Sequence, residues 1–289
     1  HGGQIFGDIG VKAMMNTKEM LDAALELAKL KSCPADAAVI NPGENIKKAL
    51  VGIDMNVQEL VIGRMLDFDC VVSHHPRCTN TKGMDELFLE QRYAMFENGI
   101  PLTEAQKLIN ASAGEGSDYR LFSNNDRNAS ASKILKMPYV CIHTPADIIV
   151  ETALQKMFDA RFAEKPRTRL CDVLDVFKEI PEYSHAVFEP KIAVGEPESY
   201  AGRIHVIMSG VTGGGPDVYN AYFRAGIGTL VLMHCTGEDV KKVDEAHIGN
   251  IINAGHMASD SYGMNRIIEA WEARGVEVVR MSGLLSPEF

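Results

Sequence analysis

The sequence lacks the features that mark disulfide-stabilised, membrane-spanning and nucleic-acid-binding proteins. Its six cysteines are scattered and form no C-x-x-C pair, which argues against a disulfide scaffold and a structural zinc ribbon. No apolar run approaches the roughly 20 residues of a membrane span. The first residues lack the charged-then-apolar pattern of a secretory signal. Acidic residues outnumber basic ones, 39 to 29, and the net charge of −10 argues against nucleic acid as a partner. We therefore expect a reduced, cytoplasmic protein that acts on a small molecule.

The patterns that are present are typical of a globular α/β protein. The chain has 289 residues, of which 46% are hydrophobic and 24% charged, enough for one large or two medium domains. Residues 49–54 read as a strand, Asn56 caps a helix, and Cys70 opens a second strand, which together predict a parallel βαβ unit. The order of strand, histidine, short loop and helix recurs later. We predict two related αβ domains, residues 1–160 and 161–289.

Residues 79–136 depart from this alternation. Helices are expected at residues 84–97 and 102–109, where apolar residues recur. Residues 113–117 and 123–132 are polar and are expected to be loops. We interpret the region as a surface excursion.

Residues 160–200 form a second irregular region. They are charged, contain four prolines and hold one expected helix, residues 170–180. We interpret them as a domain connection or small insertion. Farther on, three glycines at 213–215 join a strand to a helix, where backbone N–H groups could hold a phosphate. The segment is not G-x-G-x-x-G and has no Walker lysine, so a tight turn is the favoured interpretation.

Histidines stand where apolar strands end. Val71 and Val72 suit a buried strand, Pro76 must end it, and His74 and His75 lie between. Open α/β sheets bind ligands at the carboxyl ends of their strands. Because successive strand side chains diverge, adjacent histidines serve two metal ions, or two sides of a cleft, more easily than one ion. The alternative is a pair of surface or core histidines in a turn.

Three later segments share the pattern His-x-x-x-Asp/Glu. Residues four apart share a face where the intervening turn is helical. Mixed histidine and carboxylate ligation suits Zn, Mn, Fe or Co. An acidic residue that opens a helix can instead serve only as a favourable charge, but four clusters of strand-end histidines together favour a metal site. The three pairs are His143 and Asp147, His234 and Glu238, and His256 and Asp260.

Three of these segments, in order, resemble the Nif-three-like family, whose members are also known as type 2 homologues of GTP cyclohydrolase I. The family's marks are a strand ending in His-His-Pro, a central His-Thr-x-x-Asp, and a late Gly-His-x-x-[Ser/Thr]-[Glu/Asp]. They correspond here to residues 71–76, 143–147 and 255–260, and the likeness spans about residue 45 to the C-terminus. The resemblance implies a two-domain α/β fold with a dinuclear metal site in the cleft between the domains. It also implies a homo-oligomer, typically a hexamer.

The resemblance further implies the ligands of two divalent transition-metal ions, such as Zn, Fe or Mn. Asp147 would bridge the ions, and His143 would lie close by without ligating, as the catalytic acid or base. The sequence departs from the family in having Asp260 where Glu is usual, Pro145-Ala146 in the central motif, and no histidine pair beside His234. The implied metal ligands are His74, His75, Asp147, His256 and Asp260.

The first functional hypothesis is a dinuclear metal-dependent hydrolase, in which metal-bound hydroxide attacks a nucleotide-like substrate. Two ions about 3.5–4 Å apart could share and acidify a water, and the resemblance suggests opening of the GTP purine ring. Zinc-dependent nucleobase deamination is disfavoured because the P-C-x-x-C element is missing. The alternatives are a non-enzymatic metal-binding scaffold or partner-binding regulatory protein, and a generic metal-dependent phosphoesterase.

Overall fold

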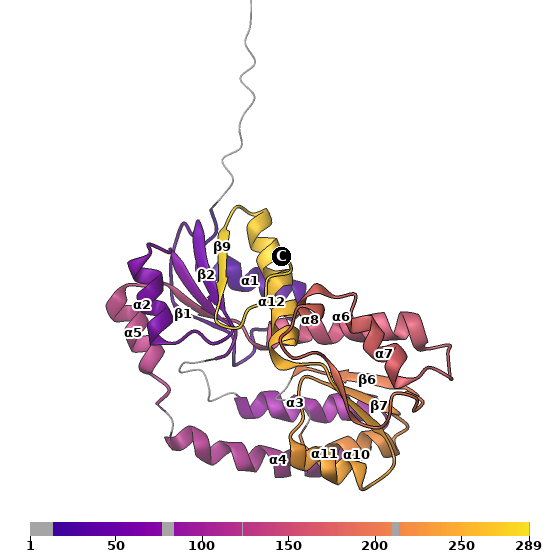
Figure 1. Cartoon of the computed structure of the whole chain (residues 1–289). Coiled ribbons are helices and arrows are strands. Elements are labelled where there is room, and N and C mark those ends of the chain that lie inside the picture. The colour runs from indigo at the N-terminus through magenta and orange to yellow at the C-terminus, as the bar shows by residue number, and fades with distance from the viewer. Residues whose placement is uncertain (1–13, 77–83, 123, 210–213, 289) are drawn as a thin grey trace, which may run out of the picture.

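Two β-sheets, each flanked by helices, form the computed structural model of the protein (Figure 1), which describes residues 14–76, 84–122, 124–209 and 214–288. The strand order is β1-β4-β3-β2-β9 in the first sheet and β5-β8-β7-β6 in the second. This arrangement confirms the predicted α/β fold of two related αβ units. The first sheet contains β1 (Ala38–Asn41), β2 (Lys48–Gly52), β3 (Cys70–Ser73), β4 (Tyr139–Cys141) and β9 (Glu277–Met281); the second contains β5 (Lys191–Val194), β6 (Ile204–Ile207), β7 (Thr229–Leu232) and β8 (Asn250–Asn253).

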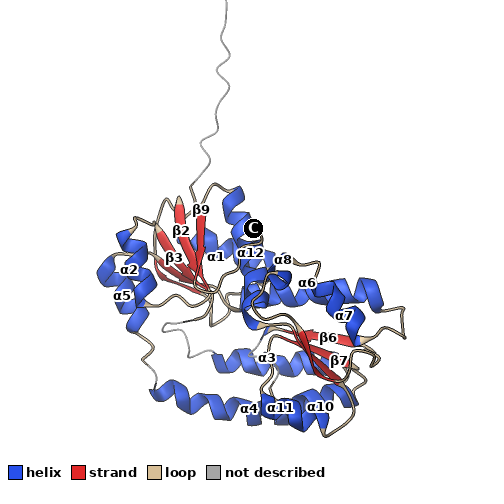
Figure 2. Ribbon diagram, viewed as in Figure 1, coloured by secondary structure: helices blue, strands red, loops and turns tan. Residues whose placement is uncertain are grey.

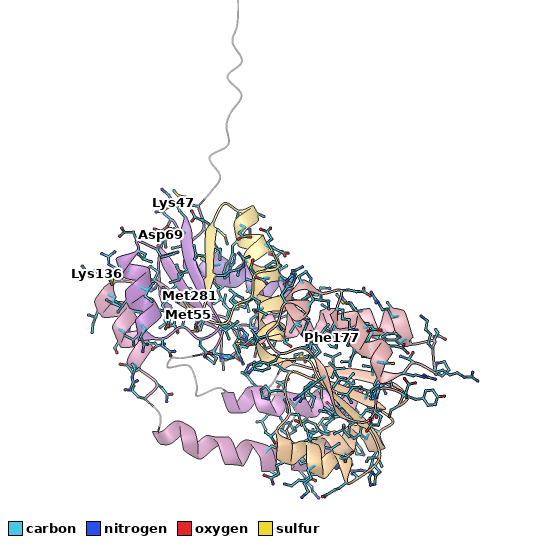
Figure 3. All side chains as sticks on the ribbon, viewed as in Figure 1. Lys47, Met55, Asp69, Lys136, Phe177 and Met281 are labelled. Carbon is cyan, nitrogen blue, oxygen red and sulfur yellow. The ribbon has the colours of Figure 1, made fainter. Side chains whose placement is uncertain are left out.

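The first sheet contains the predicted βαβ unit, in which α2 (Val57–Met65) connects the parallel strands β2 and β3. Side chains alternate between the two faces of the sheet, as the strand period requires. Val72 packs towards α1 (Thr17–Leu27) and α12 (His256–Ala273), whereas Val71 packs towards α2 and α5 (Arg127–Leu135). Met55 and Met281 pack together at the carboxyl ends of β2 and β9 (Figure 3).

The second sheet has three parallel strands, β6, β7 and β8, with β5 antiparallel at one edge. Figure 2 shows its helices on both faces. Phe177 lies in the core on the α6 face (Figure 3). On this face lie α6 (Thr144–Phe162) and α7 (Leu170–Phe177), with α8 (Pro181–Ser184) beside α12; on the other lie α3 (Met84–Glu97), α4 (Leu102–Phe122), α10 (Pro216–Arg224) and α11 (Gly237–Asp244).

The C-terminal part of the chain returns to the first sheet. Helix α12 packs against both α1 and α6, and β9 pairs in parallel with β2, with Lys48 opposite Glu277. In Figure 1 the yellow helix α12 runs from the second sheet to the first. Strands far apart in the sequence therefore complete one sheet. The domain boundary expected near residue 160 stays a prediction.

Several local expectations are wrong. Helix α4 continues through residues 113–117, and α5 occupies 127–132, so these polar segments are helical rather than loops. The reason at α5 is a buried polar face, on which Asn128 Nδ2 donates to the Met55 carbonyl oxygen at 3.0 Å. The region at 160–200, interpreted as a domain connection or small insertion, contributes strand β5 to the second sheet. Helix α1 begins after Asn16, which forms a capping box with Glu19. Residue 123 lies outside the described ranges.

Other expectations concern the turns and the cysteines. Gly214 and Gly215 adopt positive φ angles of 74° and 89° directly before α10, in keeping with a turn, whereas Gly213 lies outside the described residues. None of the cysteines in the described part of the chain forms a disulfide bond. Cys70 and Cys141 are buried, whereas Cys235 is only partly buried. None of the helices in the described ranges combines the length and apolar character that crossing a bilayer requires.

Candidate metal centre

The carboxyl ends of strands from both sheets meet at one place, and the predicted histidines lie there. His74 and His75 follow β3, His143 follows β4, and His256 opens α12 directly after β8. Parallel strands bring their carboxyl ends to one edge of each sheet, which is where α/β proteins hold ligands. The ring centroid of His75 lies 5.1 Å from those of both His74 and His256. The motifs of the first sheet thus contact the motif of the second.

Two helix starts bring the carboxylates to the same place. His143 directly precedes the first turn of α6 and Asp147 lies in that turn, with 3.8 Å between Nδ1 and Oδ2. His256 and Asp260 lie one turn apart in α12, with 3.3 Å between Nε2 and Oδ2. Four-residue spacing on a helix explains both pairs. The remaining pair, His234 and Glu238, does not contribute a carboxylate to this place, because Glu238 pairs with Lys242 on the surface.

Asp260 contacts three imidazoles. Its Oδ1 lies 3.4 Å from Nε2 of His74, and its Oδ2 lies 3.4 Å from Nε2 of His75 and 3.3 Å from Nε2 of His256. Asp147 Oδ1 lies 3.5 Å from the same His74 nitrogen. Within the described residues, three groups of side chains have donor atoms close enough to hold a metal ion. They are His74 with His75 and His143; His75 with His256 and Asp260; and His74 with Asp147 and Asp260.

The buried donor atoms at this centre fit a cation. Four of them, although buried, have no hydrogen-bond partner in the described part of the chain. An unpaired buried polar group costs about 1–3 kcal/mol, and more if it is charged. A divalent ion would accept these lone pairs and offset the carboxylate charge, and imidazole with carboxylate suits borderline transition metals. The four atoms are His74 Nε2, Asp147 Oδ1, and Oδ1 and Oδ2 of Asp260.

Partners outside the cluster orient the imidazoles. His74 Nδ1 lies 3.0 Å from the Ile142 carbonyl oxygen, so it is this nitrogen that carries the proton. His75 Nδ1 lies 2.9 Å from Asp54 Oδ1. Both contacts leave Nε2 available to the centre. Such partners fix the tautomer and ring orientation of metal-binding histidines.

His143 has a corresponding partner in Asp36. Its Nδ1 lies 2.7 Å from Asp36 Oδ2, and the same oxygen accepts a 2.7 Å hydrogen bond from Thr144 Oγ1. Neither Asp36 nor Asp54 is among the site residues predicted from the sequence. The signal for Asp54 is its place at the end of a strand, like the histidines. Asp36 lies in a loop and carries no such local signal.

The two carboxylates of the centre differ in acidity. Burial raises the pKa of Asp147 to about 8, and the neighbouring Asp260 adds to the rise although His143 opposes it. Burial also raises the pKa of Asp260, but the imidazoles of His74 and His75 outweigh it and hold that pKa well below its usual range. A metal ion would displace the proton that this environment favours on Asp147.

His234 lies at the edge of the cluster. Its ring centroid is 4.9 Å from that of His256, and burial lowers its pKa. It belongs to none of the three donor groups found among the described residues. His205 lies in β6, and its ring packs at a tilt against that of Tyr222, with 5.1 Å between ring centroids.

Comparison with known proteins identifies the family. No family profile matches the sequence, and no curated protein does. A solved NIF3 superfamily protein from Sphaerobacter thermophilus is 34% identical, with 94% of this chain and 100% of that chain covered and a TM-score of 0.90. Two structures share the fold at 12% identity: reduced HcgD from Methanocaldococcus jannaschii, with a TM-score of 0.58 and coverage of 92% and 98%, and TTHA1606 from Thermus thermophilus, with 0.51 and coverage of 93% and 98%.

Fold and site together define a two-sheet α/β protein with a buried histidine–aspartate cluster where the sheets meet. The chain belongs to the NIF3 superfamily. The resemblance of its three histidine motifs to the Nif-three-like family is thereby confirmed.

Proposed function

We propose that the protein is a metal-dependent hydrolase with a dinuclear centre. The observation that carries the proposal is the convergence of four unpaired buried donor atoms on one point between the sheets. Isolated structural histidines would not leave a carboxylate such as Asp260 without hydrogen bonds at both oxygens. The proposed metal ligands are His74, His75, Asp147, His256 and Asp260.

The donor groups divide into two sets that share Asp260. One set is His74, Asp147 and Asp260, and the other is His75, His256 and Asp260. The divergence of adjacent strand-end histidines supports two ions, each a divalent transition metal such as Zn, Fe or Mn. The distances favour Asp260 as the shared carboxylate. The bridging role that the family resemblance implies for Asp147 stays a prediction.

The residues around the centre have distinct roles in this proposal. Bound metal ions supply Lewis-acid polarisation of the substrate and lower the pKa of a water. His143 transfers a proton as general acid or base. Asp36, at 2.7 Å from His143 Nδ1, holds the tautomer that leaves Nε2 free for this transfer. The substrate that the family resemblance predicts is nucleotide-like, and hydrolytic opening of a purine ring is the predicted reaction.

A non-enzymatic metal-binding protein is the second candidate. The complete burial of His74 and Asp260 supports it, because buried ligands retain an ion without exposing it to a substrate. The more exposed His256 and His143 support the hydrolase, because a substrate can approach from their side.

Metal analysis combined with turnover tests the proposal. Protein loaded with Zn, Mn or Fe would be assayed against GTP, other nucleotides and simple phosphoesters. We expect turnover by the loaded wild type, and His143→Gln should retain its metal but lose turnover about 100-fold or more. Cleavage of the phosphoesters alone would indicate the generic phosphoesterase. Full metal content without turnover of any substrate would contradict the hydrolase and favour the metal-binding scaffold.

The family resemblance also predicts a homo-oligomer, typically a hexamer, in the cytoplasm. Symmetric assembly is common among such proteins. Light scattering should return a multiple of the 31.7 kDa chain mass. A mass near that of one chain at all concentrations would contradict this prediction.

A further inference from the structure

A cavity of about 640 Å³ lies at the open edge of β6, near the start of α6. Strand β6 is the last in its sheet, so no further strand covers this edge in the described part of the chain. The walls come from the loop after α1, from α3, from the first half of α6, from β6 and from α10. The volume lies within the range of about 300–1,000 Å³ that small-molecule sites occupy. The cavity is therefore large enough for a ligand of two or three rings.

One hydroxyl group connects this cavity with the candidate metal centre. Thr144 lines the cavity, and its Oγ1 donates to Asp36 Oδ2 at 2.7 Å. That carboxylate oxygen also lies 2.7 Å from Nδ1 of His143. Residues 33–35, directly before Asp36, line the cavity as well. A ligand held here would lie next to the residue proposed to transfer the proton.

The cavity wall is mainly apolar. Aliphatic side chains from five segments face it, together with the ring of Tyr222. The Tyr222 ring packs on that of His205 with 5.1 Å between centroids and 35° between planes. Such a wall suits a flat or ring-shaped ligand. The aliphatic residues include Leu30, Met95, Ile148, Ile207 and Val218.

The wall carries no positive charge. None of the described residues that line it is a lysine or arginine, whereas Glu90 and Glu151 are both present. Burial lowers the pKa of His205 to about 4, so its ring is neutral at pH 7. Glu151 is already engaged, because its Oε2 accepts from the backbone N–H groups of Met208 and Ser209 at 2.8 and 2.9 Å. An anionic group in the cavity would lose its hydration without gaining an opposite charge.

We propose that this cavity binds the body of the substrate, and that the bound body is an uncharged ring system without phosphate or carboxylate groups. The proposal rests on the proposed hydrolase function and specifies its substrate class. A nucleobase-like heterocycle fits the description. A phosphate on the same ligand would extend along α6 into the adjoining groove, which Lys156, Lys165 and Arg203 line.

A matched pair of probes tests the charge selectivity. Naphthalene-2,6-dicarboxamide and naphthalene-2,6-dicarboxylate have nearly the same shape, and the second carries a negative charge at each end. Ligand-detected NMR titrations would use metal-loaded protein and would be repeated after chelation, so that binding at the ions can be subtracted. We expect the diamide to bind at least about tenfold more tightly than the dicarboxylate.

Two substitutions of alanine by tryptophan test whether the diamide binds in this cavity. Ala94 lines the cavity from α3, so Ala94→Trp should fill part of it and weaken diamide binding about tenfold. Ala160 is an exposed residue of α6 that does not line the cavity, and Ala160→Trp should leave binding unchanged. Glu90→Lys places a cation in the wall and should raise dicarboxylate affinity at least about fivefold.

The proposal is overturned if the dicarboxylate binds as tightly as the diamide and Ala94→Trp removes it. It is also overturned if the diamide does not bind, or if its affinity is the same in wild type and in Ala94→Trp. These titrations read binding rather than turnover. A loaded protein that binds the diamide as expected but hydrolyses nothing would refute the hydrolase alone, and a hydrolase without diamide binding would refute the cavity proposal alone.

Discussion

Asp54 Oδ1 lies 2.9 Å from Nδ1 of His75, and Nε2 of the same imidazole lies 3.2 Å from Nε2 of His256. Asp54 follows β2 and His75 follows β3, and the parallel pairing of these strands brings the two residues to the same edge. Ser282 Oγ donates to the Asp54 carbonyl oxygen at 2.6 Å, which fixes this part of the backbone. The first sheet thus determines how His75 faces the second.

Replacement of Asp54 should weaken metal binding without removing a ligand. In Asp54→Ala the His75 ring loses the partner that holds its orientation, and such losses lower metal affinity about 10–100-fold. A competition titration with a chromogenic chelator measures the change. Asp22→Ala is the control, since Asp22 pairs with Lys18 on the exposed surface of α1, away from the metal centre. Equal affinities in wild type and Asp54→Ala would show that this pair does not orient a ligand.

The sharing of Asp260 predicts an unequal loss of metal among ligand variants. Asp260→Asn should lose both ions, because this carboxylate belongs to both donor sets. His256→Ala and Asp147→Asn should each lose chiefly one ion, because each belongs to a single set. Elemental analysis after dialysis gives the ions retained per chain. Metal content unchanged in His75→Ala, Asp147→Asn and His256→Ala would rule out this centre.

The sequence was sufficient to predict residues whose role depends on local pattern. His74 and His75 follow a β-branched run and precede a proline, and a strand end in a parallel sheet is where ligands bind. His256 and Asp260 are four residues apart, so one helical turn aligns them. These short-range rules locate each half of the centre. The order of the three motifs then indicated that the halves belong together.

The rest depends on contacts that no local pattern contains. Asp36 and His143 are more than a hundred residues apart in the sequence, and the tertiary fold brings them into contact. Strand β5 is short and exposed at Lys191, so it lacks the apolar run of a central strand. Helix α5 buries Asn128 and Ser132, and a polar buried face gives no apolar period to detect.

His205 should make stability depend on pH. Burial, with a smaller effect of Arg203, lowers its pKa from 6.5 to about 4. The folded state therefore favours the neutral ring, and this stabilisation is complete above pH 6.5 and declines as the pH falls towards 4. Between pH 7 and pH 5 the loss is about 2 kcal/mol. Protonation would also remove the acceptor that faces Asn98 Nδ2, which lies 3.4 Å from His205 Nε2.

Urea unfolding at pH 7, 6 and 5 measures this effect against His205→Gln, which keeps a polar side chain but does not titrate. The wild type should lose about 2 kcal/mol more than the variant across this range. All other titrating groups are common to both proteins, so their contributions cancel. Parallel stability curves would mean that His205 is not buried as described.

Gly263 allows α12 to approach α6 closely beside the metal centre. A Cβ atom at this position would lie 2.1 Å from the Ala146 carbonyl oxygen, a backbone atom that cannot move alone. Ala146 directly precedes Asp147, and Gly263 lies three residues after Asp260 in the same helix. Glycine inside a helix ordinarily costs about 0.5–1 kcal/mol relative to alanine. Because the two helices cross so closely here, a side chain at this position would clash, and glycine is favoured in spite of its lower helix propensity.

Gly263→Ala should therefore separate the two helices that carry the carboxylates. We expect a loss of about 1–3 kcal/mol in the free energy of unfolding, as for other overpacked positions, together with reduced metal content. Gly237→Ala is the matched control, because Gly237 lies at the start of α11 with open space around it and an ordinary φ angle. That change should leave stability within about 0.5 kcal/mol and metal content unchanged. Urea unfolding and elemental analysis measure both quantities. If Gly263→Ala kept the stability and metal content of the wild type, the contact between α6 and α12 would not be what holds Asp147 and Asp260 together.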